Sequence, residues 1–291
     1  MCGRYVRKST RREIANWFAA ADPEGVEWGP SYNVAPQTFQ PVVRLNRDTG
    51  QREIVLMRWG LIPYWSKDSK IGYSTINAKA ETVATAPAFR EAVRRRRCLV
   101  PADAFYEWQK LDRKHKQPFA IALASREPYG LAGLWERWKD PQTNSQTNPQ
   151  TNATSSEWLE TFSIITTEAN QVVAPLHHRM PVIIERKDYA RWLGGPDFLP
   201  EALARATSAA FIKESRMKIR EANEVDRKSG GDPAQPPLDL LRPFPAEQMT
   251  AWRVDKSVGN VRNDAAHLLE TPPDEPPDEP WLGFVSDPQQ S

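Results

Sequence analysis

Short apolar segments of strand length recur along most of this chain and are separated by polar turns. Their β-branched and aromatic content favours strands, and the turn at residues 48–50 joins two of them as a hairpin. They do not alternate regularly with helices, so the pattern predicts an α+β fold rather than a doubly wound parallel sheet. We expect helices at residues 9–20 and 87–96, and strands at residues 39–45, 52–58, 98–101, 105–108, 118–123, 129–135, 161–166 and 182–184.

The chain has 291 residues, which suits one large domain or two small ones. We expect one catalytic domain at residues 2–264 and a disordered acidic, Pro-rich tail at 265–291. A polar insert at 139–156 lacks the apolar surface needed to offset ordering entropy, and residues 221–237 predict a weaker loop. No run of about 18 apolar residues and no apolar leader occur, so the sequence predicts neither a membrane span nor a secretory signal.

The formal net charge of +2 hides an asymmetry between the two halves. Residues 1–137 hold 23 Lys and Arg against 14 Asp and Glu, a net +9, and the remainder holds 16 against 23, a net −7. A basic half suits a polyanion such as nucleic acid, because phosphate contacts dominate that affinity. The run of four arginines at residues 94–97 has an equally good explanation as the solvated end of a helix.

The second residue of the chain is Cys2. If Met1 is removed, Cys2 carries an α-amine and a thiol on adjacent carbons. Their reference pKa values are about 7.7–8.0 and about 8.5, so both are partly reactive near neutral pH. The amine can form a Schiff base with an aldehyde, and the thiol can then close a thiazolidine ring. Considered alone, a cysteine at position two is more simply explained as an accident of where translation starts.

The other cysteine, Cys98, lies in an apolar strand-like run and is expected to be a buried core thiol. Two cysteines are too few for a disulfide framework. Four histidines without a Cys/His cluster argue against a structural zinc site, and nothing in the sequence requires a metal or a cofactor.

Several polar residues stand out from their surroundings. Glu107 lies in a predicted strand full of aromatic residues, where desolvation raises a carboxyl pKa toward neutrality and suits proton transfer. His177 and His178 lie on a Pro-bounded turn before Arg-Met-Pro. Asn33 and Asn77 lie in extended or turn-rich loops, where asparagine is usually a turn former.

Several short motifs occur in a recognisable order along residues 2–264. They are Cys2-Gly3-Arg4-Tyr5, Tyr32-Asn33-Val34-Ala35-Pro36, Arg58-Trp59-Gly60-Leu61-Ile62-Pro63, Asn77-Ala78-Lys79-Ala80-Glu81-Thr82, Cys98-Leu99-Val100-Pro101, Phe105-Tyr106-Glu107-Trp108, His177-His178-Arg179-Met180-Pro181, Leu241-Arg242-Pro243-Phe244-Pro245-Ala246 and Val258-Gly259-Asn260-Val261-Arg262-Asn263-Asp264. Each motif is weak by itself, but the ordered set, which starts at position two, is strong. Together they resemble the SRAP family of SOS response-associated peptidases that process abasic sites.

The resemblance implies a protein that binds single-stranded DNA at abasic sites and links Cys2 to the opened deoxyribose as a shielding thiazolidine. Self-cleavage or an aminopeptidase would expose Cys2. Asn77 would orient the sugar or the Cys2 amine, Glu107 would shuttle protons, and His177 would assist ring opening. His177 is preferred to His178, because the family pattern has a catalytic His, a variable residue and then Arg-Met-Pro.

The resemblance also implies mixed, mainly antiparallel strands curled around a positively charged DNA-binding cleft. Lys79 replaces the arginine common at its position, which keeps the charge but loses the bidentate geometry. His178 replaces the acid often found beside the catalytic His. Bases beside the lesion would stack on aromatic residues such as Trp59 or Trp65. The implied DNA-binding residues are Arg4, Asn33, Trp65, Lys79 and Arg179.

Two other functions use the same residues. A thiol peptidase or N-terminal-nucleophile amidohydrolase would use Cys2 and His177 on an amide, but would have no need of the basic half. A plain nucleic-acid-binding module would need no nucleophile at all. For the DNA-processing function we expect a monomer with single-stranded DNA as partner and no membrane, acting in the cytoplasm of a bacterium or the nucleus of a eukaryote.

Overall fold

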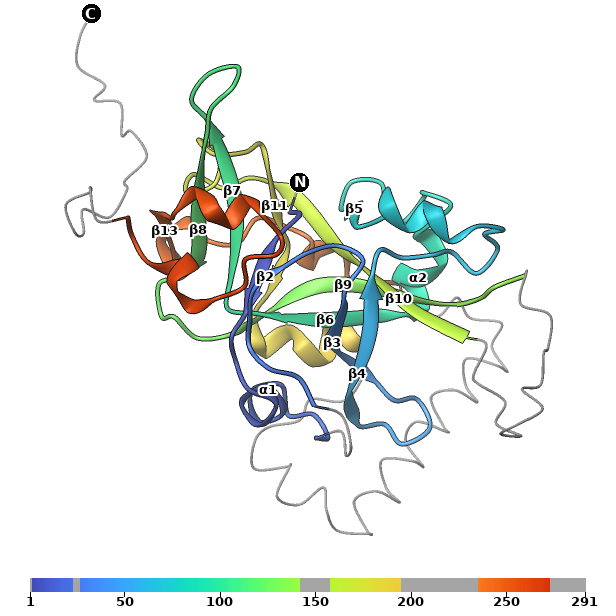
Figure 1. Cartoon of the computed structure of the whole chain (residues 1–291). Helices are drawn as coiled ribbons and strands as arrows, with labels where there is room; N and C mark the ends of the chain where they lie inside the picture. Colours follow the sequence, from blue (N-terminus) through green and yellow to red (C-terminus); the bar gives the residue numbers. More distant parts are fainter. Residues whose placement is uncertain (1, 23–26, 142–157, 195–234, 273–291) are drawn as a thin grey trace, which may run out of the picture.

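A computed structural model describes residues 2–22, 27–141, 158–194 and 235–272. Most of the described chain forms two sheets (Figure 1), and most neighbouring strands pair antiparallel, which confirms the predicted mixed α+β fold. The first sheet has the order β13-β8-β7-β1-β2. Its strands are β1 (Tyr5–Arg7), β2 (Ser31–Val34), β7 (Ala104–Lys110), β8 (Lys116–Leu123) and β13 (Met249–Arg253).

The second sheet closes on itself like a barrel. The pairings β3–β4, β4–β10, β10–β9, β9–β6 and β6–β3 form a ring, in which only β4–β10 is parallel. A closed ring leaves no unpaired edge within it. The strands of this sheet are β3 (Phe39–Leu45), β4 (Arg52–Trp59), β5 (Asn77–Lys79), β6 (Arg97–Ala102), β9 (Tyr129–Lys139), β10 (Trp158–Glu168), β11 (Arg179–Pro181) and β12 (Ile183–Ile184).

The described residues include three short α-helices, and α1 shows why such a short helix forms here. Thr10 accepts a hydrogen bond from the backbone of Glu13, whose side chain accepts one from the backbone of Thr10, so the capping box is complete. Ile14 and Phe18 are buried on its inner face. No helix in the described ranges has the length and apolar character to cross a bilayer. The helices are α1 (Arg11–Phe18), α2 (Arg90–Arg95) and α3 (Tyr189–Leu193), with 3₁₀ turns at Ser69–Tyr73, Arg186–Asp188, Leu238–Leu240, Ala246–Gln248, Lys256–Gly259 and Ala266–Leu269.

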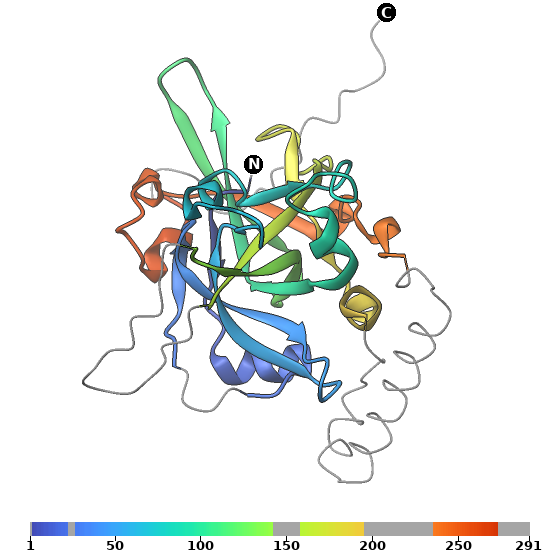
Figure 2. The same ribbon diagram turned by 90° about the vertical axis from the view of Figure 1, so that its right-hand side faces the viewer.

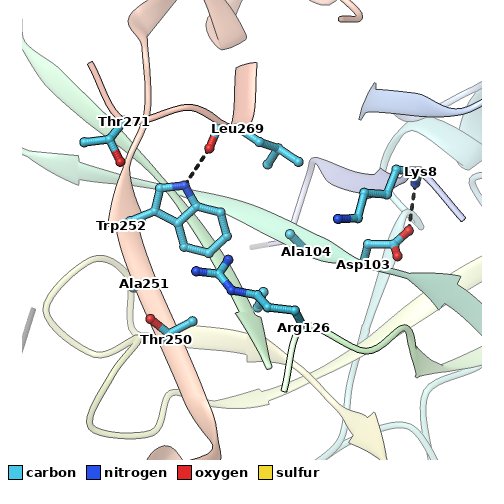
Figure 3. Close-up of a pocket in the computed structure, with 10 residues that line it drawn as sticks. Lys8, Asp103, Ala104, Arg126, Thr250, Ala251, Trp252, Leu269 and Thr271 are labelled. Atoms are coloured by element: carbon cyan, nitrogen blue, oxygen red, sulfur yellow. Dashed lines mark hydrogen bonds between the residues drawn. The ribbon is translucent and has the colours of Figure 1, made fainter. Parts of the chain in front are cut away.

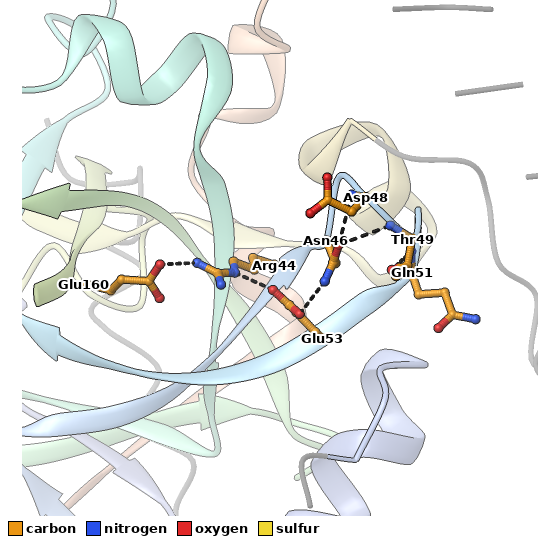
Figure 4. Close-up of polar contacts among 7 residues, drawn as sticks. All are labelled: Arg44, Asn46, Asp48, Thr49, Gln51, Glu53 and Glu160. Atoms are coloured by element: carbon orange, nitrogen blue, oxygen red, sulfur yellow. Dashed lines mark hydrogen bonds and ion pairs between the residues drawn. The ribbon is translucent and has the colours of Figure 1, made fainter. Parts of the chain in front are cut away.

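The predicted hairpin at residues 48–50 is present between β3 and β4. Asn46 Oδ1 accepts hydrogen bonds from the backbone N–H groups of Asp48 and Thr49, and Gly50 takes a positive φ of 73° that favours glycine. Below this turn, Arg44 binds Glu53 of β4 and Glu160 of β10 at 2.7 and 2.8 Å (Figure 4). Arg44 therefore ties strands together, so this cation of the basic half has a structural role.

Two arginines of the run at residues 94–97 also make contacts within the protein. Arg96 pairs with Glu136 at 2.7 Å. Arg97 donates to the carbonyls of Val93 and Arg94 at 2.9 and 2.8 Å, where a cation satisfies the last carbonyls of α2 and favours its dipole. These contacts support the helix-end explanation for Arg96 and Arg97 rather than a free phosphate-binding surface.

Most of the predicted elements are confirmed with boundaries shifted by a few residues, and some local expectations were wrong. The loop around Asn33 is part of strand β2, and Asn77 begins strand β5. The chain stays folded beyond the predicted domain end at 264, because the 3₁₀ turn Ala266–Leu269 buries Leu268 completely. The predicted disorder of residues 142–156, 221–234 and 273–291 lies outside the described residues.

Candidate active site

Cys2 is buried at the start of the first sheet. Its side chain has 0% exposure and packs in a core cluster with Tyr5, Trp59 and Phe105. The thiol lies 4.0 Å from the carbonyl oxygen of Arg4. Burial raises the pKa of this thiol above its ordinary value, and the charge of Glu107 raises it further. The sulfur is therefore protonated at neutral pH and needs a base before it can react as thiolate.

Glu107 is brought to Cys2 by strand pairing. β7 lies between β1 and β8, and Tyr5 pairs with Phe105 while Glu107 pairs with Phe119. Because alternate residues share a face, Glu107 points to the same side as Phe105, toward the core that holds Cys2. Its side chain is 4% exposed, and burial raises its pKa to about 7. A carboxyl group half protonated at neutral pH can both accept and donate a proton.

The same shift predicts how stability depends on pH. The folded pKa of Glu107, about 7, is above its ordinary value of 4.5, so the folded state holds the proton more tightly than the unfolded state. Stability from this group is present below about pH 4.5 and is lost as pH rises through 7, by on the order of 3 kcal/mol. Glu107→Gln removes this loss, so urea unfolding at pH 5 and pH 8 should show a smaller pH dependence than wild type. An unchanged pH dependence would contradict the assignment to Glu107.

Asn77 and Lys79 lie two residues apart on β5, so their side chains share a face of the strand. The Asn77 amide nitrogen donates to the carbonyl oxygens of Ile76 and Ile164 at 3.1 and 3.5 Å. Its carbonyl oxygen Oδ1 is buried and has no hydrogen-bond partner among the described residues. An acceptor left open in this way suits a donor brought by a substrate or by an amine. Lys79 is exposed.

His177 lies on the turn before β11, stacked on His178 with ring centroids 4.3 Å apart. Its Nδ1 accepts the backbone N–H of Arg179 at 3.0 Å, which leaves the proton of the neutral ring on Nε2. Burial lowers the pKa of His177, so the neutral form prevails at pH 7. The ring can therefore act as a hydrogen-bond donor through Nε2.

Arg179 is held by a bidentate ion pair rather than directed to solvent. Its two terminal nitrogens donate to Glu81 at 2.7 and 3.0 Å, and one of them also donates to the Thr166 carbonyl at 2.6 Å. The pair connects the end of the His177 turn to the segment that follows Asn77. The role of Glu81 is not visible in the sequence, because only tertiary contact reveals its partner.

Arg4, which is partly buried, and Asn33, which is buried, are joined by hydrogen bonds to each other and to the C-terminal part of the chain. The Arg4 guanidinium donates to Asn33 Oδ1 at 2.7 Å and to the Val258 carbonyl at 3.1 Å. Asn33 Nδ2 donates to the carbonyls of Val258, Asn260 and Asn263 at 3.1, 3.1 and 2.8 Å. The polar atoms of Asn33 are thus occupied in fastening the C-terminal turn near residue 258 to the N-terminal strand.

The two tryptophans proposed for base stacking differ in accessibility. Trp65 is 49% exposed in the turn that follows β4. Trp59 is fully buried, stacks on Phe162 and donates from Nε1 to the Ile76 carbonyl at 2.9 Å. The suggestion that Trp59 stacks on bases is therefore wrong, because its ring is part of the core. Cys98 is buried, as expected.

The predicted catalytic residues belong to one core cluster or adjoin its members in the chain or the sheet. The cluster that buries Cys2 also contains Phe119, Ile164 and Leu176. Phe119 and Ile164 are the pairing partners of Glu107 and Asn77, and Leu176 precedes His177. The start of β1 lies beside the β7–β8 hairpin in both views (Figure 1, Figure 2). The arrangement offers a nucleophile, a proton-transfer group and an open acceptor. Within the described ranges, His, Cys, Asp and Glu form no cluster able to hold a metal ion.

Comparisons with known proteins cover most of the chain. A crystal structure of a protein from Bacteroides thetaiotaomicron has the same fold, with a TM-score of 0.67 at 22% identity over 93% of this chain and 100% of its own. YoqW of Bacillus subtilis (strain 168), an abasic site processing protein, is 34% identical over 273 residues, 93% of this chain and 100% of YoqW. The abasic site processing protein HMCES of Gallus gallus is 29% identical, over 91% of this chain and 71% of HMCES. Since the model of the family described as SOS response associated peptidase (SRAP) also matches residues 1–229, this chain belongs to the SRAP family.

Proposed function

We propose that this protein senses abasic sites in single-stranded DNA and forms a covalent thiazolidine with them through Cys2 after Met1 is removed. The observation that carries the proposal is that Glu107, whose pKa is raised to about 7, lies close enough to the buried Cys2 for its charge to raise the pKa of the thiol. Relatives named abasic site processing proteins support the choice of substrate. The covalent bond would shield the lesion from nucleases and from error-prone bypass.

The proposed cross-linking reaction uses only the protein, the abasic site and the loss of one water. The sugar ring opens to its aldehyde while neutral His177 donates a hydrogen bond to the ring oxygen. The Cys2 amine attacks the aldehyde carbon, one water leaves, and a Schiff base forms. The sulfur then adds to the imine carbon, and the thiol proton passes to the imine nitrogen through Glu107. The Schiff base can instead lose the 3′ phosphate by β-elimination, which is a lyase reaction.

Removal of Met1 belongs to the same proposal. Autoproteolysis would hydrolyse the Met1–Cys2 peptide bond, consume one water and release methionine. Asn77 Oδ1, an open acceptor, would then orient the new α-amine. Lys79 and Trp65 are exposed and suit contacts with phosphates and bases. Arg4, Asn33 and Arg179 are engaged within the protein, and we propose that they act on DNA binding by shaping the site.

A gel experiment tests the function directly. The Met1-processed protein is mixed with a single-stranded oligonucleotide that holds one abasic site, and the products are separated under denaturing conditions. We expect a covalent species with this oligonucleotide and none with an intact oligonucleotide of the same length. Absence of any covalent species from the processed protein would refute the proposal.

The second candidate function is a thiol peptidase or amidohydrolase, which the peptidase description of the family favours. It would use the same Cys2 and His177 but would turn over repeatedly on an amide without DNA. Release of more than one equivalent of amine from a peptide substrate would favour it. Cross-linking is stoichiometric and cleaves no peptide substrate. One DNA adduct per protein molecule, with no amine released from the peptide, would therefore favour cross-linking.

The excess of cations in residues 1–137 predicts a salt-dependent affinity for single-stranded DNA. The logarithm of the association constant should fall linearly with the logarithm of salt concentration, by about 0.7 for each phosphate neutralised. Lys79→Gln should reduce that slope by up to about one unit. Lys114→Gln, which removes the same charge from the distant β7–β8 turn, should leave the slope unchanged. A salt-independent affinity measured by fluorescence anisotropy would exclude phosphate-led binding.

A further inference from the structure

A pocket lies on the face of the first sheet opposite the one that packs on Cys2. Its volume is about 300 Å³, at the lower end for small-molecule sites. Ala104 and Ala122 of its lining belong to a core cluster separate from the one that holds Cys2. Successive residues of β7 point to opposite faces, so Ala104 faces this pocket while Phe105 faces the active site. The short side chains of Ala104 and Ala122 leave the space between the larger groups open.

One wall of the pocket is a fixed aromatic–cation pair. The Trp252 ring is held by a hydrogen bond from Nε1 to the Leu269 carbonyl at 2.8 Å. The Arg126 guanidinium lies 4.1 Å from the centroid of that ring (Figure 3). Arg126 has a positive φ of 59°, which is unfavourable for a residue other than glycine. A guanidinium stacked on a ring keeps its N–H edge available for an oxyanion.

The opposite wall carries a second cation, Lys8, and Figure 3 shows Ala104 between Lys8 and Arg126. Asp103 also lines the pocket, but its carboxylate is already engaged. Its Oδ2 accepts the backbone N–H groups of Lys8 and Ser9 at 2.7 and 3.0 Å, and its Oδ1 accepts the Ser9 hydroxyl at 2.7 Å. Within the described part of the chain, neither the Lys8 ammonium nor the Arg126 guanidinium has a carboxylate partner.

We propose that this pocket binds the terminal phosphate of a small phosphomonoester of nucleotide size. Arg126 would supply a planar pair of donors, Lys8 a point charge, and the hydroxyl of Thr250 a further hydrogen bond. The apolar surface of Trp252 and Ala104 would contact the organic part of the ligand. Arg44 and Arg179, by contrast, each have their charge matched by a glutamate. The site is independent of the cross-linking chemistry proposed for Cys2.

Isothermal titration calorimetry on the full chain tests the site. Deoxyadenosine 5′-monophosphate should bind saturably, and deoxyadenosine should not. Arg126→Asn should weaken the nucleotide at least about tenfold, because it removes charged hydrogen bonds. Asparagine tolerates the backbone conformation at this position, so the variant should fold. Arg113→Asn, the same substitution in the β7–β8 turn, should leave affinity within twofold. Cys2→Ser should also leave this binding unchanged.

Two further arms complete the test. Lys8→Gln, on an exposed side chain, should weaken binding as well and serves if Arg126→Asn is unstable. A tetrathymidylate with a 5′ phosphate is compared with the same strand lacking it. Tighter binding of the phosphorylated strand would show that the pocket accepts the phosphate of a strand terminus as well as that of a free nucleotide. Either source supports the proposal when binding depends on Arg126. No saturable binding of the nucleotide, or equal weakening by Arg113→Asn, would overturn it.

Discussion

Cys2→Ser should abolish the stable adduct with abasic single-stranded DNA while leaving a Schiff base that borohydride can trap. The substitution keeps the α-amine of the processed chain and removes only the sulfur that closes the thiazolidine. The buried side chain of Cys2 changes little in volume, so the fold should survive. The measurement compares denaturing gels with and without borohydride, using protein whose Met1 removal has been verified by mass spectrometry.

Matched controls make this result specific to the thiol at position two. Cys98→Ser changes the other buried cysteine and should leave cross-linking intact if the protein folds. Cys2→Ala should behave as Cys2→Ser does. If untreated Cys2→Ser gave an adduct as heat-stable as that of wild type, thiazolidine formation would be excluded.

Glu107→Gln should slow cross-linking by roughly 10²–10⁴-fold, because general acid–base catalysis contributes about that much. The raised pKa of about 7 places the wild-type carboxyl where it exchanges protons at neutral pH. The wild-type rate should therefore change between about pH 6 and pH 8, and the rate of the glutamine variant should lose this change. Affinity for intact single-stranded DNA should stay within a few-fold, since the side chain is buried.

Single-turnover rates measured across this pH range distinguish proton transfer from a purely structural role. Glu136→Gln is the matched control, because Glu136 is also a buried acid with a raised pKa but is paired with Arg96. It should alter stability and leave the pH profile of cross-linking in place. Wild-type rates and pH profiles in both Glu107→Gln and His177→Ala would show that the assigned roles are wrong.

The strands were predictable where local pattern and tertiary structure agree. The segments 39–45 and 118–123 combine strand-forming residues with clear turn signals, and both lie in sheets. The strand positions of Asn33 and Asn77 were not predictable from local pattern, because an asparagine between prolines or in a turn-rich stretch has no strand propensity of its own. Both join sheets through partners far along the chain, since Asn77 pairs with Ile164.

In the candidate site, too, some features could be predicted from the sequence and others depend on contacts between distant residues. The position of Cys2 and the aromatic neighbours of Glu107 can be read directly from the sequence. The raised pKa of Glu107 was predicted because those neighbours exclude water from the carboxyl group. The pairing of Arg179 with Glu81 was not predictable, because the two residues are separated by 98 positions. The burial of Trp59 beside an exposed Trp65 was equally hidden, since both lie in one aromatic stretch.

The sequence by itself therefore determined the chemistry that is available: a cysteine that processing can expose, an acid among aromatic residues, a histidine on a constrained turn and a family resemblance that joins them. Only the tertiary structure decided which polar groups are open to a substrate and which are used up inside the protein. Burial and hydrogen bonding depend on contacts between distant segments, such as Arg4 with Val258 across 254 positions. Those contacts form only when segments far apart in the sequence pack together, and no local pattern encodes them.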